Sequence, residues 1–160
     1  MSEGKILAAQ ENGAYVIRMT GDVRLTLSTT IDEYFQKMYE DPSFVSVWVD
    51  LCEVEGIDST TLGLLAKLAL TVKKKFGFTP AIYSRNSGIN RLLKSMGFQR
   101  LFELHEEVCG STECTKQIPS VEGSEETVKL KVLEAHRVLM ELSEENNARF
   151  KDLMAVLEAG

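Results

Sequence analysis

One short segment of the sequence groups side chains that can take part in chemistry. Asp58, Ser59, Thr60 and Thr61 follow one another directly and bring together one carboxylate and three hydroxyls. They precede a leucine-rich run, so we expect them where a strand and loop give way to a helix, with Asp58 or Ser59 as the helix cap. The same residue types are ordinary in helix caps, and their spacing alone does not separate a cap from a reactive site.

A helix N-terminus at this segment would suit a phosphate. The first N–H groups of a helix lack intrahelical partners and carry partial positive charge. A phosphoryl group on Ser59 would therefore be held without unfolding the domain. It would still add about −1.5 to −2 charges to the surface around it. The segment is thus a candidate switch at which phosphate turns a partner interface off.

The surrounding pattern predicts an α/β domain with a mixed sheet. The turn signal at Asn12-Gly13 joins two apolar stretches into a hairpin. A helix is expected to be capped by Ser28 or Thr29 and to end at Asp41-Pro42. Further strands are expected at 46–51, 79–83 and 101–104, and further helices at 62–76 and 87–96. The element order ββαβαβαβ predicts one sheet with helices packed on it, and 46–51 is expected to be a central strand.

Composition narrows the class of protein. The chain has 160 residues, 44% of them apolar, and a formal net charge of −6. An acidic domain of this size is a poor candidate for binding nucleic acid or an anionic membrane surface. No apolar run approaches the ~20 residues of a membrane span, and the first residues lack the layout of a signal peptide. With three cysteines, an odd number, we expect reduced thiols and a cytoplasmic protein.

The last part of the chain has a different composition. Residues 108–124 contain glycine, proline and several hydroxyl residues and are expected to be a linker. Residues 125–160 are expected to form a helical extension, since 125–158 contain no glycine or proline. A heptad stripe runs through this segment and would place Asn146 at an a position. Its members are Val128, Val132, Ala135, Leu139, Leu142, Asn146, Arg149, Leu153 and Val156. The stripe leaves three arrangements open: packing back on the core, homodimerisation, or docking to a partner. Alternatively, Ser143 caps a second helix and splits the segment in two.

The sequence resembles the STAS domain of anti-sigma-factor antagonists over about residues 5–107. The resemblance lies in Thr20-Gly21-Asp22-Val23, in Val49-Asp50-Leu51, in the run from Ile57 to Leu65, and in the helix that ends at Gly97. It implies a STAS domain at 1–107, with a STAS-like mixed β-sheet packed with helices, followed by the linker and the C-terminal helical extension. Thr61 stands where typical members have glycine.

The resemblance also implies a function. Ser59 occupies the position that a partner-switching kinase phosphorylates in this family, and the unphosphorylated domain binds an anti-sigma factor or an equivalent regulator. Asp22, Asp58, Thr60 and Thr61 would support the phosphosite or contact the partner. The chain looks closest to the subgroup of HptB-dependent secretion and biofilm anti-anti-sigma factors. That subgroup implies a flagellar anti-sigma factor, a response regulator with serine kinase and phosphatase activities, and a diguanylate cyclase as partners.

Other functions have weaker support in the sequence. His105, Cys109 and Cys114 have the spacing of no common zinc ligand set, so we expect no metal. His136 is expected to be a surface residue of a helix rather than a phosphotransfer site. An arrangement of catalytic residues is not recognisable, so we expect neither an enzyme nor a cofactor. The alternative is a STAS module that senses a small ligand such as a nucleotide or a lipid.

Overall fold

The computed structural model describes residues 2–107 and 115–160. The elements are, in chain order, β1 (Lys5–Glu11), β2 (Ala14–Val23), the 3₁₀ turn η1 (Leu25–Leu27), α1 (Ser28–Glu40), β3 (Ser46–Ile57), α2 (Ser59–Phe76), β4 (Ala81–Tyr83), α3 (Ser87–Ser95), the 3₁₀ turn η2 (Phe98–Arg100), β5 (Glu103–His105), β6 (Lys116–Gln117), α4 (Glu125–Leu142) and α5 (Glu144–Ala159). Through β5 this is the predicted order ββαβαβαβ, and the α/β class is confirmed.

The sheet is mixed, with strand order β5-β4-β3-β2-β1-β6. β2, β3, β4 and β5 run parallel to one another, whereas β1 runs antiparallel to β2 and to β6. β3 is an inner strand, as predicted. β1 and β2 form the predicted hairpin, in which Asn12 and Gly13 have φ of 52° and 84°, as a type I′ turn requires.

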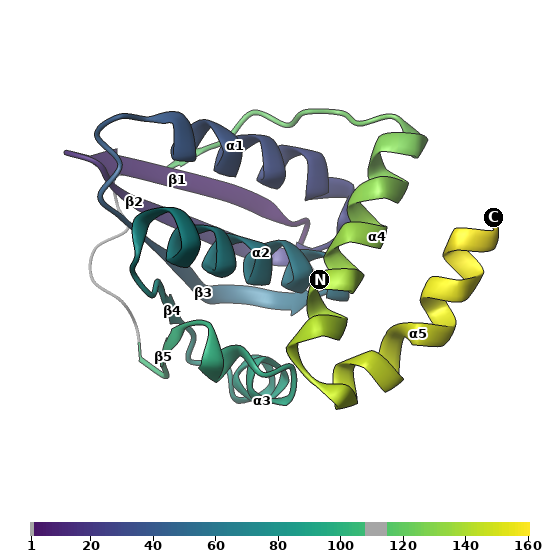
Figure 1. The fold of residues 1–160 in the computed structure, drawn as a ribbon. Helices are drawn as coiled ribbons and strands as arrows, with labels where there is room; N and C mark the ends of the chain where they lie inside the picture. The colour runs from purple at the N-terminus through teal and green to yellow at the C-terminus, as the bar shows by residue number, and fades with distance from the viewer. Residues whose placement is uncertain (1, 108–114) are drawn as a thin grey trace.

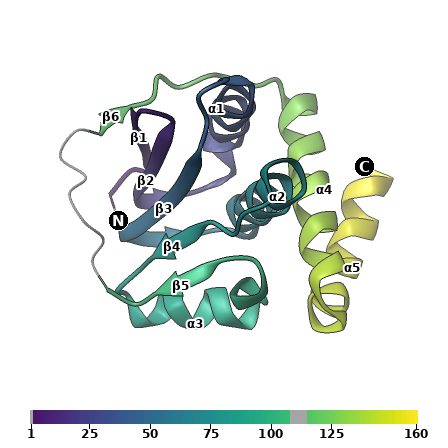
Figure 2. The same ribbon diagram turned by 60° about the vertical axis from the view of Figure 1, so that its left-hand side comes forward.

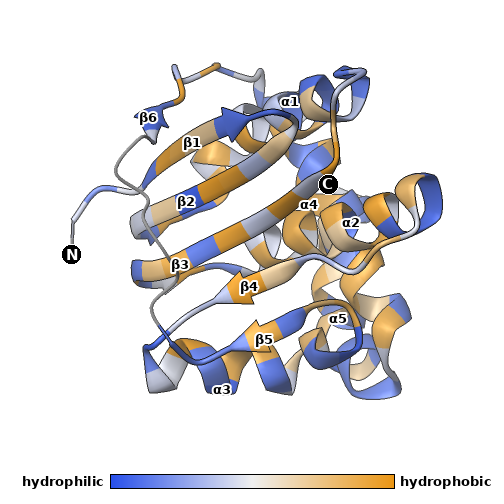
Figure 3. Cartoon of the chain, turned by 90° about the vertical axis from the view of Figure 1, so that its left-hand side faces the viewer, coloured by the Kyte–Doolittle hydropathy of each residue, from blue (hydrophilic) through white to orange (hydrophobic). Residues whose placement is uncertain are grey.

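Helices lie on one side of the sheet. Figures 1 and 2 show α1 and α2 against the sheet, α4 beyond α2, and α3 along the β5 edge. The alternating apolar residues of the inner strands, such as Ile17, Met19 and Val49, are fully buried. The other face of the sheet is turned towards the viewer in Figure 3, with the helices behind it. None of the helices within the described residues is long and apolar enough to cross a membrane.

The start of α1 differs from the prediction. α1 begins at Ser28 directly after η1, with Leu27 at the N-cap position, and no side chain caps its N-terminus. Ser28 and Thr29 are buried, and neither hydroxyl has a hydrogen-bond partner among the described residues. The prediction that one of them caps this helix is therefore wrong. Both residues already lie in the first helical turn, where the preceding 3₁₀ turn directs the chain into the helix.

The C-terminal segment forms two helices rather than one. The Ser143 hydroxyl accepts a hydrogen bond from the Asn146 N–H at 3.0 Å and caps α5, as the alternative prediction had it. The heptad stripe does not continue across this turn. Val156, a member of the stripe, is 71% exposed, whereas Phe150 and Met154, which lie off the stripe, are the buried residues of α5. α4 packs on α2, which was the first of the three expected arrangements. Pairing of two copies through this extension stays a prediction.

Further contacts hold the extension and the segment before it against the α/β domain. Asn146 is fully buried, and its amide nitrogen donates to the carbonyl oxygens of Met96 at 3.0 Å and Leu139 at 2.9 Å. It therefore ties the turn between α4 and α5 to the end of α3. Part of the expected linker is also ordered: β6 adds to the sheet beside β1, and the Val121 N–H donates to the Thr30 hydroxyl at 2.9 Å.

Candidate functional site

The predicted cluster lies where β3 ends and α2 begins. Asp58 is the N-cap of α2, and one of its carboxylate oxygens accepts from the Thr61 N–H at 2.9 Å and from the Thr61 hydroxyl at 2.8 Å. The threonine that stands where typical STAS sequences have glycine therefore strengthens the cap. Of the two capping candidates, Asp58 and Ser59, the structure selects Asp58.

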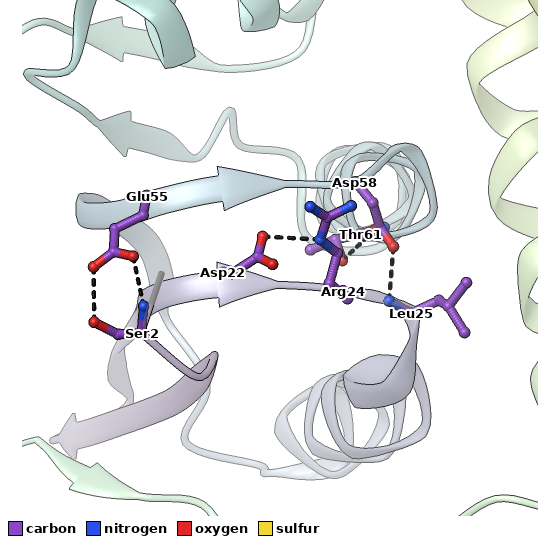
Figure 4. Close-up of polar contacts among 7 residues, drawn as sticks. All are labelled: Ser2, Asp22, Arg24, Leu25, Glu55, Asp58 and Thr61. Atoms are coloured by element: carbon purple, nitrogen blue, oxygen red, sulfur yellow. Dashed lines mark hydrogen bonds and ion pairs between the residues drawn. The ribbon is translucent and has the colours of Figure 1, made fainter.

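Asp58 also joins the start of α2 to η1. Its second carboxylate oxygen accepts from the Leu25 N–H at 2.7 Å. Nearby, the Arg24 side chain donates to Asp22 at 2.8 Å. Figure 4 shows Asp22 and Arg24 beside the Asp58 cap at the same end of the sheet. Asp22 and Asp58 thus share one surface, although Asp22 pairs with Arg24 rather than with the cap.

The three hydroxyls of the cluster differ in burial. Thr60 and Thr61 are 2% and 0% exposed, whereas Ser59 is half-buried. Ser59 is the first residue of α2, which begins three residues before the predicted start at 62. Of the three hydroxyl residues, Ser59 is the most exposed.

The Ser59 side chain contacts the C-terminal extension. Its hydroxyl oxygen lies 2.7 Å from Nε2 of His136 in α4. Nδ1 of His136 lies 2.6 Å from the Val132 carbonyl oxygen, which can only accept. A neutral His136 therefore carries its proton on Nδ1 and accepts the Ser59 proton at Nε2. The sequence predicts that Ser59 is exposed at the start of this helix, but it is half-buried because α4 partly covers it.

His136 is not the surface residue that the sequence predicted. It is only 2% exposed and lies edge-on to Phe150 of α5, with ring centroids 5.1 Å apart. The helix periodicity allowed either placement, and the α4–α5 turn decides it by folding Phe150 over the imidazole. The available signal in the sequence was the place of His136 directly after Ala135 and three residues before Leu139, two apolar residues that are buried in the structure.

α4 approaches α2 very closely next to this hydrogen bond. A Cβ atom on Gly63 would lie 2.4 Å from the carbonyl oxygen and 2.5 Å from the Cβ of Ala135. These atoms are backbone and the first side-chain carbon, so they have no flexible end that could move aside. Gly63 and Ala135 are therefore the two small residues that allow the helices to meet.

A network of charges bridges α1, α2 and α4. Lys67 of α2 contacts Glu134 at 2.5 Å and Asp32 of α1 at 3.4 Å, and Lys131 of α4 contacts Asp32 at 2.6 Å. Burial raises the pKa of Asp32, but the Lys131 hydrogen bond and the Lys67 charge outweigh it and hold that pKa below its usual value. Burial lowers the pKa of Lys67, but Glu134 and Asp32 together raise it.

The chain is similar to a known domain family and to a solved structure. The model of the STAS domain family matches residues 5–109, more than half of the chain. This chain belongs to the STAS domain family. Among solved structures, it is similar to an anti-sigma factor antagonist from Mycobacterium paratuberculosis, with 20% identity, a TM-score of 0.57, and coverage of 66% of this chain and 87% of the other. Comparison with curated proteins gives no match.

The STAS match contains Asp22 and the whole of the Asp58–Thr61 cluster, but it ends before β6. α4 and α5 therefore lie outside the matched region. The contact between Ser59 and His136 joins a residue of the STAS domain to a residue of the extension.

The described residues give no support to a metal site at His105. His105 stacks on Tyr83 with ring centroids 4.7 Å apart. Cys109 and Cys114 lie outside the described residues. Within 2–107 and 115–160, no group of three His, Cys, Asp or Glu side chains is placed to hold a metal ion.

Proposed function

We propose that this STAS protein is an anti-sigma-factor antagonist that acts as a phosphorylation-controlled partner switch. In its unphosphorylated form it would bind an anti-sigma factor or another regulator, and a phosphate on Ser59 would release that partner. It would work in the cytoplasm by binding rather than by catalysis. The observation that carries the proposal is the position of Ser59, directly after the Asp58 cap on the first turn of α2. The name of the similar mycobacterial structure supports it.

The local chemistry suits such a switch. The first turn of α2 offers N–H groups and the positive end of the helix dipole, so a phosphate there is compatible with a folded domain. The phosphate would add about −1.5 to −2 charges beside the Asp58 carboxylate. A partner that presents carboxylates to this surface would then be repelled. Asp22 would help to shape the same surface through its ion pair with Arg24.

The resemblance to the HptB-dependent subgroup supports a finer assignment of partners. The bound regulator would be a flagellar anti-sigma factor. A response regulator with serine kinase and phosphatase activities would add and remove the phosphate, and a diguanylate cyclase would be a further partner. The role in biofilm formation and secretion follows from the same resemblance and is part of the proposal.

A pull-down with paired baits tests the switch. Ser59→Ala should retain the anti-sigma factor, recognised by its own binding to a sigma factor, whereas Ser59→Asp should capture less of it. The aspartate carries one charge rather than two, so the loss is expected to be partial. Ser87→Asp is a matched control, because Ser87 is the first residue of α3, after the Asn86 cap, and is exposed. Equal capture by Ser59→Ala and Ser59→Asp would contradict the proposal.

A further inference from the structure

We propose that a phosphate on Ser59 acts by releasing α4 and α5 from the STAS domain. In the unmodified protein, α4 is bound to the side of α2 that carries Ser59, and the phosphorylated protein no longer holds it there. This inference rests on the proposed function, because it takes Ser59 as the phosphorylated residue. The contacts that support it are the Ser59–His136 hydrogen bond and the close approach of Gly63 to Ala135.

Phosphorylation removes the hydrogen bond to α4. When the Ser59 oxygen attacks the γ-phosphorus of ATP, an O–P bond forms, the bond from that phosphorus to the leaving ADP breaks, and the hydroxyl proton passes to a base of the kinase and then to solvent. The oxygen then has no proton to donate. The Nε2 lone pair of a neutral His136 then faces a phosphate ester. Nε2 of this 2%-exposed imidazole has lost its hydrogen-bond donor, while Nδ1 keeps the Val132 carbonyl oxygen.

The space beside Ser59 leaves little room for the phosphate. Gly63 lies four residues after Ser59, one helical turn along α2, where α4 is so close that a single added carbon would meet Ala135 at about 2.5 Å. Nε2 of His136 already lies 2.7 Å from the Ser59 oxygen. A phosphorus atom with three oxygens is larger than the proton that it replaces, so α4 has to move away.

The nearby charges do not compensate for the phosphate. Asp58 precedes Ser59 and is negative, and its two oxygens are already occupied by Thr61 and Leu25. Arg24, which lies beside the Asp58 cap, is already paired with Asp22 at 2.8 Å. Lys67 lies eight residues after Ser59 along α2, a rise of about 12 Å. Lys67 is engaged by Glu134 and Asp32, and Lys131 by Asp32.

The same contacts govern access to Ser59. With α4 bound, the hydroxyl points at a buried histidine, so a kinase has to act on molecules in which α4 has moved away. Once attached, the phosphate keeps α4 from returning. The two effects have one cause: α4 and a phosphate compete for the space around the Ser59 oxygen.

Hydrogen–deuterium exchange on the full chain tests this directly. Phosphoserine is incorporated at position 59 during synthesis, so that no kinase is needed. The amides of α4 should then exchange about tenfold faster or more than in the unmodified protein, while those of β3 stay protected. Phosphoserine at position 87 is the matched control, because it places the same charge at the first residue of α3. Unchanged or slower exchange in α4, as expected if a protonated His136 bound the phosphate, would overturn the inference.

A second variant separates crowding from charge. Gly63→Ala should release α4 in the absence of phosphate, because its Cβ meets Ala135, although alanine favours the α2 helix itself. Leu70→Ala, on the exposed side of α2, should leave α4 protected. If Gly63→Ala also leaves α4 protected, the close approach does not control docking and the inference fails. A contrary result in either exchange experiment would refute the release of α4 without changing the pull-down result. Equal capture by the Ser59→Ala and Ser59→Asp baits would refute the proposed function without deciding whether α4 is released.

Discussion

The hydroxyl oxygen of Ser59 lies 2.7 Å from Nε2 of His136, a residue 77 positions further along the chain. Ser59 belongs to the matched STAS region and His136 to the extension beyond it. The candidate phosphosite is therefore in contact with a part of the chain that the family pattern does not include.

The pair should show a measurable coupling in stability. Ser59→Ala removes one hydrogen bond and should cost about 1 kcal/mol, while His136→Ala also leaves a cavity beside Phe150 and should cost about 2 kcal/mol or more. In urea unfolding, the double variant should be less destabilised than the sum of the two by about 1 kcal/mol. Arg137→Ala, on the exposed side of α4, is the control. Additive effects of Ser59→Ala and His136→Ala would show that the hydrogen bond contributes nothing to stability.

The charge network should make the bound extension sensitive to acid. The pKa of Asp32 is lower in the folded chain than in the unfolded chain. Its carboxylate therefore stabilises the fold above its unfolded pKa of about 3.9, and this contribution is lost as the pH falls through the folded pKa. Wild type should be more stable than Asp32→Asn at pH 7, with a gap that narrows towards pH 3.

Urea unfolding at the two pH values measures that gap. Glu33→Gln, the exposed neighbour on α1, is the control and should differ little from wild type at pH 7. A gap between wild type and Asp32→Asn that is the same at pH 7 and pH 3 would mean that the contacts with Lys67 and Lys131 do not stabilise the folded chain.

Asn146 should be essential to the turn between α4 and α5. Asn146→Ala removes two hydrogen bonds and leaves the carbonyl oxygens of Met96 and Leu139 without this donor, at a cost of about 2 kcal/mol. Asn147→Ala, one residue later and exposed, should change the free energy of unfolding by less than about 0.5 kcal/mol. Thermal unfolding of the two variants side by side decides the matter, since equal melting temperatures would refute the role of Asn146.

The sequence predicted those parts of the fold that depend on local patterns. The Asn12-Gly13 turn, the helix capped by Asp58 and the helix that ends before Gly97 all follow from short-range rules for turns and caps. The prediction for Ser28 and Thr29 failed because the 3₁₀ turn before them starts the helix without a side-chain cap. From sequence alone, a serine or threonine inside the first turn of a helix cannot be told apart from one that caps the helix.

The covering of Ser59 could not be predicted from local patterns. It depends on where α4 lies relative to α2, and that is decided by residues far apart in the chain: Gly63 with Ala135, and Asp32 with Lys131. Each of these residues has an ordinary place in its own helix. Only their pairing in the folded chain identifies the contact, and for that reason His136 was expected on the surface.

The most direct test of the account is the position of the phosphate in protein isolated from cells that carry the cognate kinase. Intact-mass measurement followed by fragmentation should find one phosphate, on Ser59, and none in Ser59→Ala. Because Thr60 and Thr61 are 2% and 0% exposed, neither should be modified. A phosphate that persists in Ser59→Ala, or that maps to either threonine, would contradict the assignment of Ser59 as the switch.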